Sequence, residues 1–150
     1  MTLREVLRLR IDVTEPLVIG DTAFGRRLLV GSTGGSLYGA RVNGTVNPGG
    51  GDWLLVPSDG WARPDIRHTV TTGDGAVLYL QGTGLIEMNP ATQAAIAGGS
   101  PTEFEDAYLR VHFTIDTGDP RYTWLTHALF LADGRIQPGP AIEYRISQVD

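Results

Sequence analysis

Four places along the chain carry side chains suited to acid–base chemistry. Asp65 and Arg67 lie two residues apart in a segment that predicts a β-strand, so their side chains share one face. If that face lines a cavity, the guanidinium holds the carboxyl ionised and the pair can orient a substrate carbonyl. Otherwise the pair is a structural salt bridge within the fold. Both interpretations stay open at this point.

A second place is the alternating run from Tyr108 to Asp116. Its polar members are Tyr108, Arg110, His112, Thr114 and Asp116, and they alternate with Leu109, Val111, Phe113 and Ile115. The apolar face belongs to the core. The polar face either meets solvent, which is usual for an antiparallel sheet, or lines a wet cavity. In a cavity His112 could transfer a proton and Arg110 could stabilise an oxyanion.

Asp52 and Trp53 form the third place, directly after three consecutive glycines. Glycine permits the tight turns and close approaches that other residues resist, so Asp52 is either the cap of a turn or a general base at a cavity mouth. In the second case Trp53 supplies an apolar wall. The fourth group is spread along the chain: the aromatic residues Tyr79, Trp124 and Tyr144, which we expect to contact a substrate.

Composition excludes several classes of function. The chain has no cysteine and no lysine, which rules out disulfides, thiolate metal sites, Schiff-base chemistry and a P-loop lysine. A net charge of −5 argues against nucleic acid as a partner. The three histidines show no metal-ligand spacing, so we predict no metal and no cofactor. No apolar run reaches the ~20 residues that span a bilayer, and we expect one cytoplasmic domain over residues 1–150.

Short alternating segments separated by glycine and proline predict the elements that position these side chains. The expected strands cover residues 7–13, 27–30, 37–46, 53–56, 65–72, 76–81, 108–116, 124–132 and 142–149, with a further short strand at 85–88. Hairpin turns are expected at Gly34-Gly35, Gly73–Gly75 and Asp133-Gly134. One short helix should run from Ala91 to Ala97, capped by Asn89. About nine strands and one helix predict an all-β fold, a closed antiparallel barrel.

Four motifs in this order resemble a known family. They are Gly44 to Trp53 with its Pro-Gly-Gly-Gly-Asp-Trp ending, Asp65-Ile66-Arg67, Asp74-Gly75-Ala76, and Phe113 to Leu125. The chain is similar, over roughly Phe24 to Val149, to the bacterial and fungal family called domain of unknown function 3237 or uncharacterised protein family 0311. His68 stands where that family usually has an aromatic residue, and Thr126 where it often has asparagine.

The resemblance implies a barrel like that of allene oxide cyclase, with a ligand cavity open at one end and no cofactor. We therefore expect a cofactor-independent cyclase, isomerase or lyase acting on a small oxygenated, partly apolar metabolite. Asp52, Asp65 or His112 would transfer the proton, and Arg67 or Arg110 would stabilise an oxyanion. Trp53, Tyr79, Trp124 and Tyr144 would line the pocket.

Two alternatives to the enzyme stay open, a small-molecule carrier and an interaction protein whose barrel is filled by side chains. We also expect a homodimer or larger homo-oligomer, because Leu125, His127, Leu129 and Leu131 give the expected strand 124–132 an apolar face.

Overall fold

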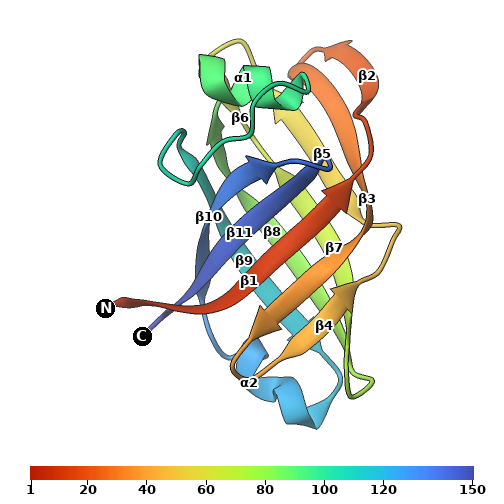
Figure 1. Cartoon of the computed structure of the whole chain (residues 1–150), viewed down its shortest axis with the longest axis vertical. Coiled ribbons are helices and arrows are strands. Elements are labelled where there is room, and N and C mark those ends of the chain that lie inside the picture. The colour runs from red at the N-terminus through yellow and green to blue at the C-terminus, as the bar shows by residue number, and fades with distance from the viewer.

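Alternating apolar residues close most of an eleven-stranded sheet into a barrel in the computed structural model, which describes all 150 residues (Figure 1). The strands are β1 (Leu3–Val13), β2 (Leu17–Thr22), β3 (Gly25–Gly39), β4 (Asn43–Val46), β5 (Gly51–Val56), β6 (Trp61–Ala62), β7 (Asp65–Thr72), β8 (Val77–Glu87), β9 (Leu109–Thr117), β10 (Phe130–Gln137) and β11 (Ala141–Val149). Two helices, α1 (Pro90–Ile96) and α2 (Thr123–Thr126), complete the fold. Neither helix has the length and apolar character that a membrane crossing requires.

The ring closes because β1 pairs with β11 on one side and with β3 on the other. β4 and β5 both lie between β3 and β7, and each pairs with a different part of these two strands. Every pairing around the ring is antiparallel. β2 and β6 lie outside the ring and pair only with β3 and β8. This confirms the predicted closed antiparallel barrel, although the sequence indicated fewer and shorter strands.

The interior is a continuous apolar core of 24 buried residues. Phe113 and Phe130 face each other across β9 and β10 and are fully buried. α2 closes the lower end of the barrel in Figure 1, and its Leu125 joins the core. α1 and the β2–β3 hairpin stand at the opposite, upper end. Polar side chains therefore enter the interior only where the apolar alternation is interrupted.

Two predicted strand breaks are wrong. Gly34 and Gly35 lie inside the single strand β3, and a Cβ on Gly35 would sit 1.9 Å from the Arg10 carbonyl oxygen. Gly82 and Gly84 lie inside β8, which joins the expected strands 76–81 and 85–88. Glycine at these positions lets neighbouring backbones approach closely within the barrel wall instead of forming a turn.

The expected strand 124–132 is also wrong in its first half. Asp119 caps a 3₁₀ turn, Pro120–Tyr122, by accepting a hydrogen bond from the Arg121 amide at 2.9 Å, and α2 follows directly. This adds a second helix to the single one predicted. Asp133 and Gly134 lie inside β10, so the last turn comes after Gln137. The apolar face expected on strand 124–132 does not exist, because Leu125 is in the core.

Two local predictions are confirmed. The Asn89 side chain accepts a hydrogen bond from the Thr92 amide at 2.9 Å and so begins α1, whose predicted range differs by one residue at each end. The segment from Gly73 to Gly75 turns the chain between β7 and β8, which pair as a hairpin.

Candidate functional site

Asp52 is the one acidic side chain buried inside the barrel. On β5 it shares the inward face with Leu54, and it is only 8% exposed. Its Oδ1 accepts a hydrogen bond from the Asp65 amide at 2.9 Å. Burial raises the pKa of this carboxyl to about 7, because the apolar surroundings disfavour the charged form more than one hydrogen bond favours it. Near neutral pH both the ionised and the protonated form of Asp52 are therefore populated.

Tyr144 enters the same interior from β11. Its ring packs edge-on against Phe113, with ring centroids 5.3 Å apart, and the residue is 2% exposed. Burial, and then the negative charge of Asp52, raise the pKa of the phenol, so it stays protonated as a hydrogen-bond donor. The two side chains thus face a common part of the interior.

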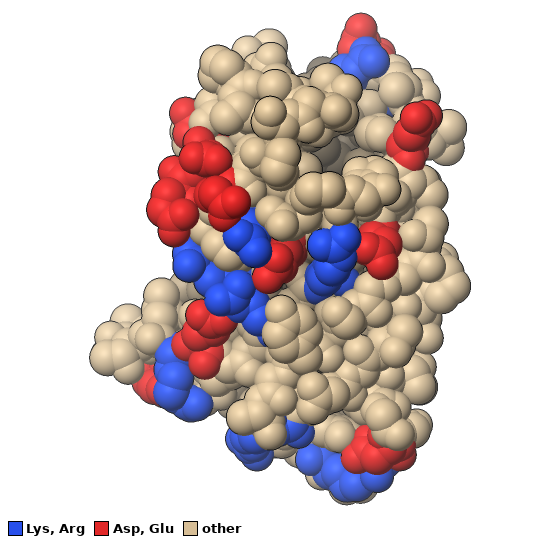
Figure 2. Space-filling model, in the orientation of Figure 1, with Lys and Arg blue, Asp and Glu red and all other residues tan.

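Neither polar end of this pair is fully sealed. The Tyr144 hydroxyl and the second carboxylate oxygen of Asp52 form no hydrogen bond with the protein, yet neither is among the fully enclosed unpaired polar atoms. Figure 2 shows the molecule hollowed at its upper end, between α1 and the β2–β3 hairpin. A small molecule that reached the interior beside these two side chains would find one titrating acid and one hydroxyl donor.

Ser32 and His68 form a second polar layer beside Asp52. Asp52 is paired with Val30 on β3 and with Ile66 on β7, and Ser32 and His68 lie two residues further along those strands. Strand alternation therefore puts all three side chains on the inner face. Ser32 and His68 are 6% and 4% exposed. Neither residue was predicted as part of the site, although the alternation of His68 with the apolar Ile66 and Val70 is a signal in the sequence that places it inside.

Each of these two residues has a buried polar atom without a partner, Ser32 Oγ and His68 Nδ1. Gly50 lies between them: its carbonyl accepts a hydrogen bond from the Ser32 amide at 2.9 Å, and a Cβ on Gly50 would sit 2.8 Å from His68 Nδ1. Burial lowers the pKa of His68 to about 4, so the imidazole is neutral at pH 7. Because both atoms are enclosed by the protein, a buried water is the kind of partner that could satisfy them.

Burial thus reverses the usual order of the two pKa values, because an aspartate normally has the lower pKa and a histidine the higher one. The pKa of the carboxyl lies near 7 and that of the imidazole near 4, so only Asp52 changes its charge near neutral pH. Pairs of groups whose surroundings push their pKa values apart are typical of acid–base sites. No three histidine and carboxylate side chains converge closely enough to hold a metal ion.

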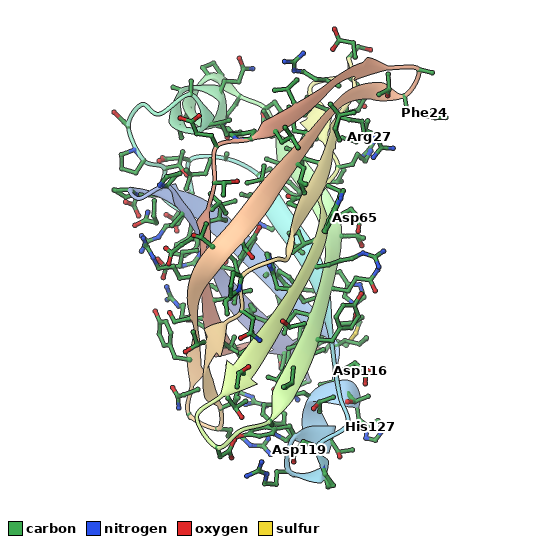
Figure 3. All side chains as sticks on the ribbon, turned by 90° about the vertical axis from the view of Figure 1, so that its right-hand side faces the viewer. Phe24, Arg27, Asp65, Asp116, Asp119 and His127 are labelled. Carbon is green, nitrogen blue, oxygen red and sulfur yellow. The ribbon has the colours of Figure 1, made fainter.

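Asp65 and Arg67 lie on the outer wall, where the expected pair is observed but is neither buried nor inside the barrel. Arg67 Nε is 3.7 Å from Asp65 Oδ1, and the two side chains are about half exposed (51% and 45%). Figure 3 shows Asp65 on the outer side of the barrel. Arg67 lines a hollow of about 320 Å³ with Trp53 and Tyr79, whose side chains also point outward.

Arg110 and His112 lie on a different part of the outer wall. Both are exposed and line a groove of about 650 Å³, so the polar face of β9 meets solvent. Trp124 is on α2 at the lower end of the barrel, where the Arg41 guanidinium lies 3.8 Å from its ring centroid. The structure therefore brings together the side chains of Asp52 and Tyr144, with the Asp65 amide bound to Asp52, and places the side chains of the other predicted site residues on the outer wall or at the lower end.

Comparison with known proteins gives this barrel a family. The family model described as "Protein of unknown function (DUF3237)" matches residues 1–149. The chain belongs to the DUF3237 family. A UPF0311 protein of Clostridium acetobutylicum is 31% identical over 132 residues, which cover 87% of this chain and 84% of that protein. The resemblance inferred from the four motifs is confirmed.

Solved structures share the barrel of this DUF3237 protein. A protein with unknown function from Clostridium acetobutylicum has a TM-score of 0.86 and 27% identity, covering 100% of this chain and 97% of the other. An enzyme from Penicillium herquei has a TM-score of 0.71 and 20% identity, covering 99% and 94%. The second likeness is one of fold alone.

Proposed function

We propose that this DUF3237 protein is a cofactor-independent enzyme that moves a proton within a small oxygenated, partly apolar molecule at the upper end of the barrel. The observation that carries the proposal is the Asp52 carboxyl, which is buried among apolar side chains and has a pKa raised to about 7. A general acid–base works best when its pKa lies near the working pH. The Penicillium herquei enzyme supports the proposal, because a barrel of this fold carries catalysis there.

The geometry suggests a division of roles among the four polar residues. Ionised Asp52 removes a proton from the carbon next to a substrate carbonyl, and the electron pair moves onto the carbonyl oxygen. The Tyr144 hydroxyl donates a hydrogen bond to that oxyanion. If Asp52 returns the proton to another carbon of the conjugated system, the net change is an isomerisation. If the enolate carbon first attacks a second carbonyl carbon of the same molecule and Asp52 protonates the alkoxide that forms, the net change is a ring closure. Ser32 and His68, whose unpaired polar atoms are enclosed, add polar groups beside Asp52 without touching the substrate.

Proton exchange in D₂O tests this role without knowledge of the natural substrate. We expect the wild-type protein to accelerate deuterium uptake beside the carbonyl in at least one member of a panel of cyclic ketones and enones, followed by NMR. The exchange rate should rise as the pH is increased, with an apparent pKa near 7 that reports the ionisation of Asp52. Asp52→Asn should lower it by a factor on the order of 100 or more, since a positioned acid–base contributes about that much.

Arg67→Ala is the matched control, because Arg67 lies on the outer wall. It should leave the exchange rate unchanged. Equal exchange rates in wild type and Asp52→Asn would contradict the proposal. A loss of activity in Arg67→Ala as large as that in Asp52→Asn would contradict it too.

We further propose that the protein self-associates, through β2 instead of the strand expected from the sequence. β2 pairs only with β3, so its other edge has free backbone donors and acceptors. Leu17, Val18 and Ile19 on β2 are at least half exposed, and Phe24 at the hairpin tip is 74% exposed. Figure 3 shows Phe24 projecting away from the barrel. An open, apolar strand edge is a template for pairing with a second copy.

A further inference from the structure

The outer wall of the barrel carries a groove that is separate from the interior site. It crosses five neighbouring strands, β8, β9, β10, β11 and β1, and has a volume of about 650 Å³. That volume lies in the range of small-molecule sites, about 300–1,000 Å³. Leu3, Leu85 and Leu131 supply apolar surface, and Arg110, His112 and Ser147 supply polar groups. The lining is thus mixed, as ligand sites usually are.

Arg110 is an arginine without an ion pair in this groove. Its register partner across the sheet is Asp133 on β10, which would be the natural counter-ion. Asp133, however, uses both carboxylate oxygens on Arg145, one of them at 3.0 Å from Arg145 Nε. Arg110 is left with a single hydrogen bond, to the carbonyl of the adjacent Leu109 at 3.1 Å.

An unpaired arginine is unusual in this protein. Nine of the twelve arginines lie within 4.0 Å of a carboxylate oxygen, and the exceptions are Arg27, Arg41 and Arg110. Arg41 stacks on Trp124, and only Arg110 of the three lines the large groove. Aromatic rings position it: its guanidinium lies 5.0 Å from the Tyr108 ring centroid, and Trp61 packs edge-on against Tyr108 at 5.6 Å.

The charges of the lining limit what can bind. Arg145 binds Asp133 and lies 3.7 Å from Glu105, while Glu5, the other carboxylate of the groove, is bound by Arg8, which also binds Glu143. Arg110 is thus the one arginine of the lining that no carboxylate oxygen contacts. A monoanion would balance it, whereas a dianion would also face Asp133 and Glu5. His112 lies two residues along β9 on the same face, roughly 7 Å away at about 3.4 Å per residue.

We propose that this groove binds a small organic monocarboxylate. The carboxylate would take the free N–H groups of Arg110 in a forked, two-oxygen contact. The apolar body would lie along Leu85 and Leu131, with His112 beside the carboxylate. This site is independent of the acid–base function proposed for Asp52.

Benzoate is the probe that tests the proposal, with benzamide as its neutral counterpart. In ¹H–¹⁵N spectra of the full chain, benzoate should shift amides of β9 and β10 around Arg110, and benzamide should bind at least tenfold more weakly. Arg110→Gln should weaken benzoate binding at least tenfold. Arg27→Gln removes another unpaired arginine outside the groove and should change nothing, and the spectra show whether each variant is folded.

Three results would overturn the proposal. One is benzoate binding that is unchanged in Arg110→Gln, and another is the absence of any shift in β9 and β10. The third is loss of benzoate binding in Asp52→Asn, which would place the ligand inside the barrel. If the groove amides are instead protected by a second copy of the chain and benzoate has no effect, the groove is a self-association surface and not a ligand site. Retained benzoate binding in an Asp52→Asn variant without exchange activity keeps the two sites distinct.

Discussion

At the scale of single residues, one cause explains the chemistry of the interior. The apolar core that closes the barrel disfavours charge, so it raises the pKa of Asp52 to about 7 and lowers that of His68 to about 4. The same burial leaves Ser32 Oγ and His68 Nδ1 without partners. Buried polar atoms without partners cost stability, and in native proteins an ordered water, local strain or a functional role accounts for them.

The raised pKa of Asp52 has a consequence for stability with a definite sign. In the unfolded chain an aspartate ionises near pH 3.9, but in the fold it stays protonated up to about 7. Between these values the folded state binds the extra proton, so the free energy of unfolding falls as pH rises, by roughly 4 kcal/mol in all. Below pH 4 this penalty is absent.

His68 works in the opposite direction. Its folded pKa near 4 lies below the unfolded value of about 6.5, so its contribution to stability is lost as pH falls through that window. The two slopes offset each other in the wild-type protein between about pH 4 and 6.5. Urea melts of wild type and Asp52→Asn should therefore be compared at each pH. We expect the variant to be nearly as stable at pH 4 and more stable by a few kcal/mol at pH 8; a difference independent of pH would show an ordinary carboxyl.

Arg67 gives a second prediction at this scale. Its ion pair with Asp65 spans 3.7 Å between half-exposed side chains, and such pairs contribute at most about 1 kcal/mol. Thermal melts of Arg67→Ala should thus overlay those of wild type within a few degrees. A loss of several kcal/mol that Asp65→Asn restores would mean that the pair is a buried structural bridge, as one interpretation of the sequence held.

At the scale of elements, the sequence predicted strands better than their ends. Alternation identified the cores of β1, β5, β7, β9 and β11, because a half-buried strand needs apolar residues at every second position. It misjudged Gly34-Gly35 and Gly82, since a glycine in a turn and a glycine packed against a neighbouring strand look identical in sequence. Alternation also could not decide whether the polar face of β9 lines a cavity or meets solvent, because it separates the two faces of a strand without giving the surroundings of the polar one.

Gly82 offers a test of this account of strand glycines. A Cβ at that position would lie 2.7 Å from Phe113 Cε1 and 2.8 Å from Val111 Cγ1. Gly82→Ala should therefore destabilise the barrel by about 1–3 kcal/mol through overpacking. Gly73→Ala is the matched control, since a Cβ there meets nothing within 4 Å; it should be neutral or slightly stabilising. Equal denaturation midpoints for the two variants would contradict the packing explanation.

At the scale of the whole molecule, the closed ring pairs both edges of its strands, so that only β2 and β6, which lie outside the ring, have an unpaired edge. The sequence predicted the closed barrel correctly, and the four motifs predicted the family. It could not predict β2 or the arrangement of the site, because register and long-range pairing decide which side chains meet. Asp52 and Tyr144, 92 residues apart, share the interior only because β1 and β11 close the ring.

Self-association is the prediction that belongs to this scale. Sedimentation velocity at micromolar concentration should give about twice the chain mass of 16.2 kDa. Ile19→Lys should yield monomers, because a lysine on the free edge of β2 opposes pairing with a second copy. Leu129→Lys changes an equally exposed leucine elsewhere and should leave the dimer intact. A wild-type monomer, or dissociation by Leu129→Lys alone, would count against the β2 surface.

The most direct test of the central claim is the titration of Asp52 itself. The ¹³C chemical shift of its carboxyl carbon can be followed by NMR from pH 3 to 9, with Asp52→Asn identifying the resonance. A carboxyl that is buried and lightly hydrogen-bonded should titrate with a midpoint near pH 7. A midpoint near 4, the value of a solvated aspartate, would contradict the account of the interior as an acid–base site.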